Sequence, residues 1–187
     1  MTIITDTLEL ADPREDLRQA YFDMAEEFLA AGEGHWVRLA DEARADFAAF
    51  LRRMAENARG LNLRPEWVPY NDYWLLRGGR MLGRLNFRHE LTPHLLKEGG
   101  HIGYCIRPSQ RGRGYGTRQL ALALDRVRTF GLPRVLITCD VDNVASARVI
   151  LNNGGMLEDV RLSEETGKLK ARYWITLAVP CANRGPL

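Results

Sequence analysis

The sequence predicts a mixed fold of helices and strands, of the α/β (α+β) class, arranged as one domain. A strand-like run over residues 101–106 passes through a glycine- and arginine-rich turn into a helical pattern that begins at Thr117. An apolar strand pattern over 134–139 follows that helix, and a hairpin signal at Gly78-Gly79 precedes it. With 187 residues, of which 45% are hydrophobic, the chain suits one domain with a substantial core.

Two amphipathic helices are expected in the first half of the chain, after a short edge strand over residues 7–10. Asp12 and Pro13 are typical of a helix start, and the apolar repeat that follows them ends at Gly32. The second helix is expected over residues 41–59. The apolar residues that recur at helical spacing in the two helices, and that we expect in the core, are Leu17, Tyr21, Met24, Phe28, Ala43, Phe47, Phe50, Leu51 and Met54.

The second half of the chain alternates strands with helices. In order, we expect an irregular loop over 61–71, strands over 72–77 and 80–88, a helical turn from Thr92-Pro93 to Lys97, a strand beginning at His101, a helix over 117–130, a strand over 134–139, a helix capped by Asn143, and strands over 156–161 and 169–179. The strand over 134–139 is apolar throughout, which predicts burial on both faces.

Composition and charge exclude several classes of protein. No apolar run approaches the ~20 residues of a membrane span, and no signal-peptide pattern is visible at the start, so we expect a soluble, cytoplasmic protein. The three cysteines are too few for a disulfide framework, and no CxxC or HxxxH pair favours zinc. A net charge of +2 is too small to argue for a nucleic-acid partner.

The turn over residues 111–116 has the chemistry of a phosphate site. The first turn of a helix leaves backbone N–H groups without partners, and the helix dipole adds positive potential there. Glycines remove the Cβ atoms that would keep an anion away from these N–H groups. Arg111 and Arg113 add positive charge. The turn fits neither the P-loop nor the dinucleotide GxGxxG pattern.

The spacing of Arg111, Gly114 and Gly116 matches Arg/Gln-x-x-Gly-x-Gly, which resembles the acyl-CoA pyrophosphate loop of the GNAT superfamily of N-acetyltransferases. Asn143 and Ser146, followed by a helix that ends at Gly154-Gly155, are similar to the second motif of that superfamily. The strings around these motifs also resemble one set of small bacterial predicted acetyltransferases of unknown substrate. The resemblance covers about residues 70–178.

The resemblance implies a GNAT fold, with a central, mixed, mostly antiparallel twisted sheet of about six or seven strands flanked by helices. A splayed pair of parallel strands would hold CoA, and a bulge at Gly103 could open the slot. Residues 1–70 would form a helical, acceptor-side half, residues 71–179 the CoA-binding core, and residues 180–187 a tail. Dimers are common among such relatives, so a homodimer is a possible assembly.

The resemblance also implies the residues that bind acetyl-CoA, the expected co-substrate; no metal is expected. The pantetheine arm would lie along the strand beside Cys105, Ile106 and Arg107. Asn143 and Ser146 would contact the cofactor or merely cap their helix. The pyrophosphate would be held by the backbone N–H groups of the loop, which are those of Arg111, Gly112, Arg113, Gly114, Tyr115, Gly116 and Thr117.

The implied reaction is acetyl transfer to a primary amine by direct attack, which needs a neutral amine and therefore a route for its proton. His101 is the first candidate for the base, although the usual position falls one residue earlier, at Gly100. His89 and Glu90 are second choices. Ile150 occupies the position at which relatives often have a tyrosine that acts as the general acid. Tyr104, Tyr173 or solvent would then protonate the leaving thiolate.

Two other functions remain open from the sequence. The isoleucine at position 150, which can donate no proton, and the uncertain base also suit a non-catalytic acyl-CoA sensor or adapter on the same scaffold. A nucleotide- or RNA-binding role for the arginine-rich loop is a weaker alternative. The acceptor, a small-molecule or protein amine, is not predicted, because residues 1–70 resemble nothing informative.

Overall fold

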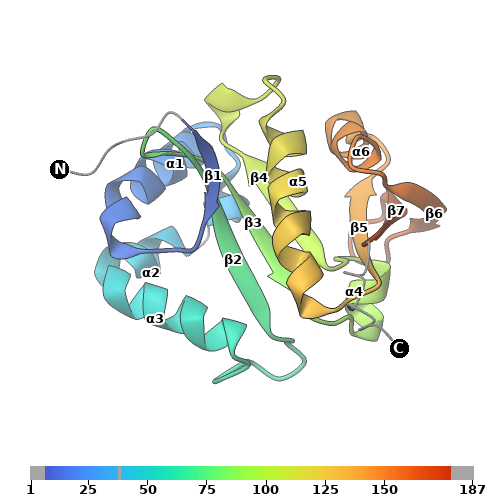
Figure 1. The fold of residues 1–187 in the computed structure, drawn as a ribbon, viewed down its shortest axis with the longest axis horizontal. Helices are drawn as coiled ribbons and strands as arrows, with labels where there is room; N and C mark the ends of the chain where they lie inside the picture. The colour runs from blue at the N-terminus through green and yellow to red at the C-terminus, as the bar shows by residue number, and fades with distance from the viewer. Residues whose placement is uncertain (1–6, 38, 178–187) are drawn as a thin grey trace, which may run out of the picture.

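The computed structural model describes residues 7–37 and 39–177, which form two antiparallel sheets flanked by helices (Figure 1). The first sheet has the order β1-β2-β3-β4, and the second has the order β5-β7-β6. The strands are β1 (Leu8–Ala11), β2 (Tyr70–Arg77), β3 (Arg80–Arg88), β4 (Ile102–Ile106), β5 (Arg134–Asp140), β6 (Met156–Leu162) and β7 (Leu169–Thr176). The α+β class and the number of strands confirm the prediction.

The two sheets meet where β4 and β5 lie side by side without a continuous ladder. The His101 N–H donates to the Leu136 carbonyl at 2.7 Å, and the Leu136 N–H donates to Nδ1 of His101 at 2.9 Å. Beyond this junction the strands separate. Tyr104, near the end of β4, contacts Ser146, which follows the end of β5, so the two strands run in the same direction. The expected splayed parallel pair is therefore present, and it divides the expected central sheet into two.

Helices cover both faces of the first sheet. Three helices from the first half of the chain, α1 (Arg18–Ala30), α2 (Ala40–Ala45) and α3 (Phe47–Ala58), form one apolar core with the face that carries Trp74 and Cys105. The opposite face packs against α5 (Tyr115–Val127) in a second core that continues into β5 and β7. The remaining helices are α4 (Pro93–Lys97), which precedes β4, and α6 (Val144–Leu151), which follows β5.

The first half of the chain departs from the prediction in two places. Asp12 does not cap a helix: a 3-10 turn over Glu15–Leu17 comes first, and α1 begins only at Arg18. The single helix expected over 41–59 is broken at Asp46, whose extended backbone separates α2 from α3 and whose carboxylate accepts from the Ala49 N–H at 2.8 Å. The predicted core residues are buried, except Leu51, which is half-buried.

Elements of the second half are placed within a few residues of the prediction. The hairpin turn at Gly78-Gly79 has φ values of 56° and 74°, which only glycine adopts readily. The Thr92 and Asn143 caps are both formed. The helix expected over 117–130 begins two residues earlier and ends as a 3-10 turn over Arg128–Phe130. The tail over 180–187 and the end of the last predicted strand lie outside the described residues.

Within the described residues, no helix has the length and apolar character needed to cross a membrane.

Candidate active site

The loop between β4 and α5 is built to present backbone N–H groups. A 3-10 turn over Pro108–Gln110 follows β4, and Gly112 and Gly114 then take left-handed backbone conformations with φ values of 72° and 77°. Gly114 is the N-cap of α5 and supplies no side chain to close the helix end. An L-residue with a side chain would be strained at both positions.

Six consecutive N–H groups in this loop, those of residues 112–117, make no hydrogen bond to any residue that the structure describes. The first bonded donor after them is the Arg118 N–H, which reaches the Gly114 carbonyl at 3.2 Å. A Cβ placed on Gly112 or Gly114 would meet nothing within 4 Å, so the space beside them is open. Unpaired N–H groups at a helix N-terminus, beside open space, form a site for an anion.

Two of the predicted cofactor-binding arginines are bound by glutamates from the first half of the chain instead: Arg107 by Glu27 of α1, and Arg111 by Glu33, which follows α1. The Nε of Arg107 donates to Glu27 at 2.5 Å, and the same carboxylate accepts from the N–H and the hydroxyl of Ser109. Arg111 forms two bonds of 2.7 Å to Glu33 and a third, of 3.1 Å, to the Ile106 carbonyl. Burial opposes ionisation of Glu27, but the bonds from Arg107 and Ser109 outweigh it and lower its pKa. These arginines therefore hold the loop in shape.

Arg113 and Arg118 are the two arginines near the loop whose positive charge is available to a ligand. Both side chains are exposed at the start of α5. Neither forms a hydrogen bond or an ion pair with another residue in the described ranges. A phosphate in the loop would therefore meet these two guanidinium groups without displacing an existing partner.

Asn143 and Ser146 sit at the start of α6, close to the end of β4. The Asn143 side chain caps the helix by accepting from the Ser146 N–H at 3.0 Å. The Tyr104 hydroxyl lies 2.9 Å from the Ser146 hydroxyl and so spans the gap between β4 and α6. Burial raises the pKa of Tyr104 to about 12, and its bond to Ser146 lowers it less. Tyr104 is therefore a neutral O–H donor in the splay.

Asn153 is a site residue that the sequence did not single out. Its side-chain amide donates to the Thr117 carbonyl at 3.2 Å and to the Val149 carbonyl at 2.8 Å. These bonds fasten the end of α6 to the first turn of α5. The asparagine pair just before Gly154-Gly155 was the available signal.

The other cofactor candidates lie on β4. Cys105 is buried on the face covered by α1, and burial raises the pKa of its thiol to about 11, so the thiol is unreactive. Ile106 is half-buried against the α5 side. The β3–β4 register runs without a shift from Gly83–Ile106 to Phe87–Ile102, so the bulge expected at Gly103 is absent. Divergence of the strands beyond His101 opens the splay instead.

The predicted bases do not gather at the loop. His101 is 5% exposed, and burial, aided by Arg88, lowers its pKa to about 4. Since its Nδ1 accepts from Leu136, the neutral ring carries its proton on Nε2. His89 lies at the far end of β3, with Nε2 2.7 Å from Oδ1 of Asn71, and Glu90 beside it is exposed.

Tyr173 and Ile150 belong to the core on the α5 side. Tyr173 lies in the middle of β7, opposite Ile137 and Leu157, and burial raises its pKa. Ile150 is fully buried on α6. The structure thus brings together the loop, Tyr104 and Ser146, and leaves His89, Glu90 and Tyr173 outside this group.

Comparison with known proteins gives one family and a set of similar folds. The family model for the acetyltransferase (GNAT) domain matches residues 7–156. No curated protein matches the chain by sequence. Among solved structures, the chain is similar to RimL, a ribosomal L7/L12 alpha-N-protein acetyltransferase solved with coenzyme A, with a TM-score of 0.67 and 21% identity over 95% of this chain and 98% of that one.

Two further solved structures share the fold, with similar TM-scores and sequence identities. The microcin C7 self immunity acetyltransferase MccE, in complex with acetyl-CoA and AMP, has a TM-score of 0.67 and 17% identity, over 92% of this chain and 94% of that one. Mycobacterium smegmatis RimJ, in complex with CoA-disulfide, has a TM-score of 0.66 and 20% identity, over 90% of this chain and 81% of that one. At these identities the likeness establishes the fold.

Proposed function

We propose, from the premise that the chain belongs to the acetyltransferase (GNAT) family, that it transfers an acetyl group from acetyl-CoA to a primary amine. The family match confirms the resemblance that the motifs around Gly114 and Asn143 predicted. The observation that carries the proposal is the row of six unpaired N–H groups over residues 112–117, at the N-terminus of α5 and beside open space.

The residues of the loop fit the diphosphate of CoA. The N–H groups over 112–117 supply hydrogen bonds, and Arg113 and Arg118 supply charge. The pantetheine arm would follow the edge of β4 that faces β5, because the other edge is paired with β3. The neighbours solved with CoA or acetyl-CoA support this assignment.

In the reaction the amine nitrogen bonds to the thioester carbonyl carbon, the C–S bond breaks, and the amine gives up one proton while the thiolate takes one up. In this proposal Tyr104, which keeps its proton at pH 7, donates a hydrogen bond to the departing sulfur beside the splay, and the thiolate takes its proton from solvent. His101 fastens β4 to β5, because its protonated Nε2 has no lone pair with which to act as a base. Deprotonation of the ammonium then falls to solvent.

A matched pair of glycine variants tests the proposal. Gly114 and Gly131 lie at the two ends of the same helical segment, both with positive φ and both with nothing within 4 Å of an added Cβ. Alanine at either position costs about 1 kcal/mol of backbone strain. We expect Gly114→Ala to weaken acetyl-CoA binding by about 10-fold or more in calorimetry, and Gly131→Ala to leave it unchanged.

Equal affinities for the two variants would show that the diphosphate binds elsewhere. A sensor or adapter on the same scaffold, which the buried Ile150 at the tyrosine position favours, would bind acetyl-CoA but release no CoA with any amine. Acceptor-dependent release of CoA, followed with a thiol reagent, distinguishes the enzyme from the sensor.

A further inference from the structure

An apolar strip on β6 and β7 lies exposed on one face of the second sheet. Ala171 and Tyr173, on the same face of β7, are buried in the core shared with α5. Toward β6 that core ends, and the side chains become open to solvent. The residues of the strip are between 46% and 65% exposed, and they are Leu157, Val160, Leu162 and Leu169.

The register of the two strands shows that these side chains share a face. Directly opposed residues of neighbouring antiparallel strands point to the same side of a sheet, as do residues two apart in one strand. The opposed pairs are Leu157 with Tyr173, Val160 with Ala171, and Leu162 with Leu169. The strip therefore continues the core face of the sheet outward to its edge. Contiguous exposed apolar patches of this kind mark sites of interaction.

β6 is the outer strand of this sheet (Figure 1). In the described part of the chain it pairs with β7 alone. An unpaired strand edge presents backbone N–H and C=O groups to any strand that aligns with it. The register with β7 shifts between Leu157 and Asp159 and is regular from there to Leu162. The regular segment is thus a length of edge on which a further strand can pair.

The sequence of β6 is complementary to itself when two copies of the strand pair antiparallel about Val160. In that register Val160 is opposite its own copy, and Asp159 is opposite Arg161 of the second copy. The relation is symmetric, so the pair of opposite charges occurs twice. Leu162 then lies opposite the irregularity that follows Leu157. The apolar strips of the two copies thereby become one.

The charges already on β6 are compatible with this pairing. Arg161 lies 2.7 Å from Asp159 of its own chain, and its side chain is 52% exposed. Asp159 also lies 3.0 Å from Arg172, which is buried. Pairing would give each Arg161 a second carboxylate and would break no ion pair that β6 makes within one chain.

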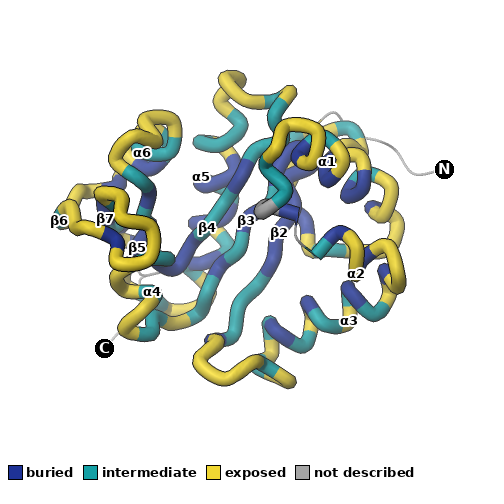
Figure 2. Tube along the Cα trace, turned by 180° about the vertical axis from the view of Figure 1, so that it is seen from behind, coloured by how far each residue is buried: buried dark blue, intermediate teal, exposed yellow. Residues whose placement is uncertain are grey.

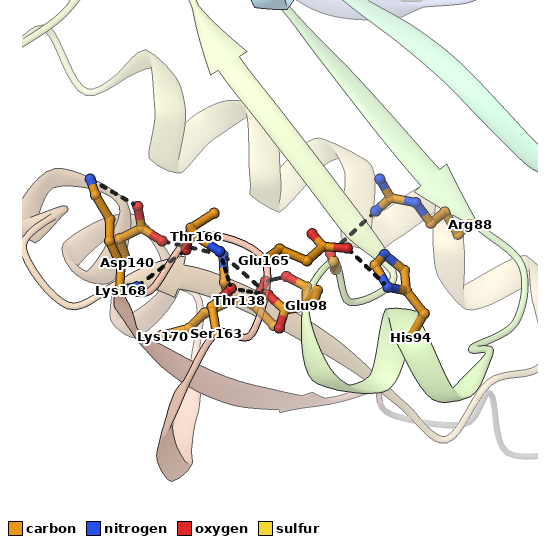
Figure 3. Close-up of polar contacts among 11 residues, drawn as sticks. Arg88, His94, Glu98, Thr138, Asp140, Ser163, Glu165, Thr166, Lys168 and Lys170 are labelled. Atoms are coloured by element: carbon orange, nitrogen blue, oxygen red, sulfur yellow. Dashed lines mark hydrogen bonds and ion pairs between the residues drawn. The ribbon is translucent and has the colours of Figure 1, made fainter.

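The opposite face of the second sheet is different, because its polar side chains bind one another (Figure 3). Lys170 lies 3.2 Å from Asp140 and 3.9 Å from Glu98. Glu98 also accepts from the Ser163 hydroxyl at 2.8 Å. This face is therefore polar and internally paired, whereas the face with the strip gains contacts only from a partner.

We propose that the strip and the edge of β6 form an interface between two copies of this chain. The two β6 strands pair antiparallel about Val160 and join the two three-stranded sheets into one sheet of six strands. A two-fold pairing uses the free edge of both copies, so assembly stops at the dimer. Eight side chains of the two strips form the apolar centre of the interface. The inference does not depend on the proposed acetyl transfer.

Sedimentation equilibrium of the full chain measures the assembly. At concentrations on the order of 100 µM we expect twice the 21.3 kDa mass of one chain. Val160→Lys places two ammonium groups opposite each other, which should raise the Kd of the dimer at least about 10-fold. Leu61→Lys is the control, because Leu61 is also 46% exposed and lies outside the strip. Circular dichroism checks the fold of both variants.

Cysteine cross-linking tests the register and does not require the lysine variant to fold. In a Cys181→Ser background, Val160→Cys brings two thiols within reach of a disulfide across the two-fold axis. The two other cysteines, Cys105 and Cys139, are buried. With oxidised glutathione we expect a covalent dimer from Val160→Cys. We expect none from Leu169→Cys, which is equally exposed but lies one strand in from the edge.

Three results would overturn the interface. The first is a monomer at every concentration. The second is a dimer whose Kd is the same for Val160→Lys and Leu61→Lys, because it would use another surface. The third is a covalent link that forms as readily from Leu169→Cys as from Val160→Cys, because it would reflect random collision. None of these results bears on the binding of acetyl-CoA, which is measured separately.

Discussion

His101 is a titratable residue that the fold uses in its neutral form. Its ring is buried, lies edge-on to Trp174 with 6.2 Å between the ring centroids, and accepts a hydrogen bond from the Leu136 N–H. Protonation would remove the lone pair that makes this bond and would place a charge in a dry site. The sequence could show only that a histidine stood at the start of an apolar strand.

The stability of the protein should therefore depend on pH through His101. The folded pKa of His101, about 4, lies below the ordinary 6.5. Neutral His101 therefore makes its full contribution to the free energy of unfolding above pH 6.5. That contribution, about 3 kcal/mol, is lost as the pH falls toward 4. Urea unfolding of the wild type at pH 7, 5.5 and 4.5 measures this slope. His101→Asn should be less stable than the wild type at pH 7. Its free energy of unfolding should fall less steeply than that of the wild type between pH 7 and 4.5.

The exposed His94 provides the control for that titration. His94→Asn should keep the wild-type dependence on pH. If His101→Asn and the wild type lose stability in parallel between pH 6.5 and 4.5, the folded pKa of His101 is close to its ordinary value.

At the scale of elements, a helix cap explains a break between two helices that hydrophobic periodicity did not predict. The apolar repeat over 41–59 predicted one helix, because Ala43, Phe47 and Phe50 share a face in a continuous helical register. The structure breaks that register at Asp46, whose carboxylate caps α3 and leaves α2 as a separate turn and a half. An aspartate just before an apolar residue was a readable cap signal.

Removing this cap should destabilise α3 and little else. We expect Asp46→Ala to lower the free energy of unfolding by about 1 kcal/mol, because the Ala49 N–H loses its acceptor. Asp41→Ala, in the first turn of α2, is the matched control. Urea denaturation followed by circular dichroism measures both, and an equal loss in the two variants would contradict the cap.

The elements around the loop were the most predictable part of the chain. Each is specified by residues close in sequence: a turn glycine, a cap, or an apolar strand between polar ends. The ten residues from Pro108 to Thr117 therefore contained almost all of the information about the candidate phosphate site. The ion-pair cluster of Glu98, Asp140 and Lys170 was not predictable, since these residues come from three separate segments.

At the scale of the whole molecule, the first half of the chain supports the candidate phosphate-binding loop of the second. α1 lies across the sheet from α5 (Figure 2), yet Glu27 and Glu33 reach Arg107 and Arg111 across 80 and 78 positions of sequence. β1 also joins the first sheet, with Leu8 opposite Arg77. The sequence could not show these links, because nothing local to Glu27 or Glu33 specifies a distant partner.

Neutralising both glutamates should loosen the loop without touching the ligand. We expect Glu27→Gln combined with Glu33→Gln to weaken acetyl-CoA binding by roughly 3- to 10-fold, because ordering the loop then opposes binding. Glu26→Gln, on the same helix but paired with Arg44, is the control. Calorimetry measures all three proteins. A rise in affinity would instead show that the glutamates compete with the diphosphate for Arg107 and Arg111.

The bonds from Glu27 and Glu33 to the loop have a consequence for protein engineering. The sequence predicts that the first half lies on the acceptor side, so one design for changing acceptor specificity exchanges its helices between homologous proteins and keeps the second half. In this chain such a graft would discard the partners of Arg107 and Arg111 unless glutamates were placed at position 27 of the incoming helix and at position 33 of the loop that follows it. Chimeras designed at a boundary near residue 70 should transplant these two positions together with the loop they brace.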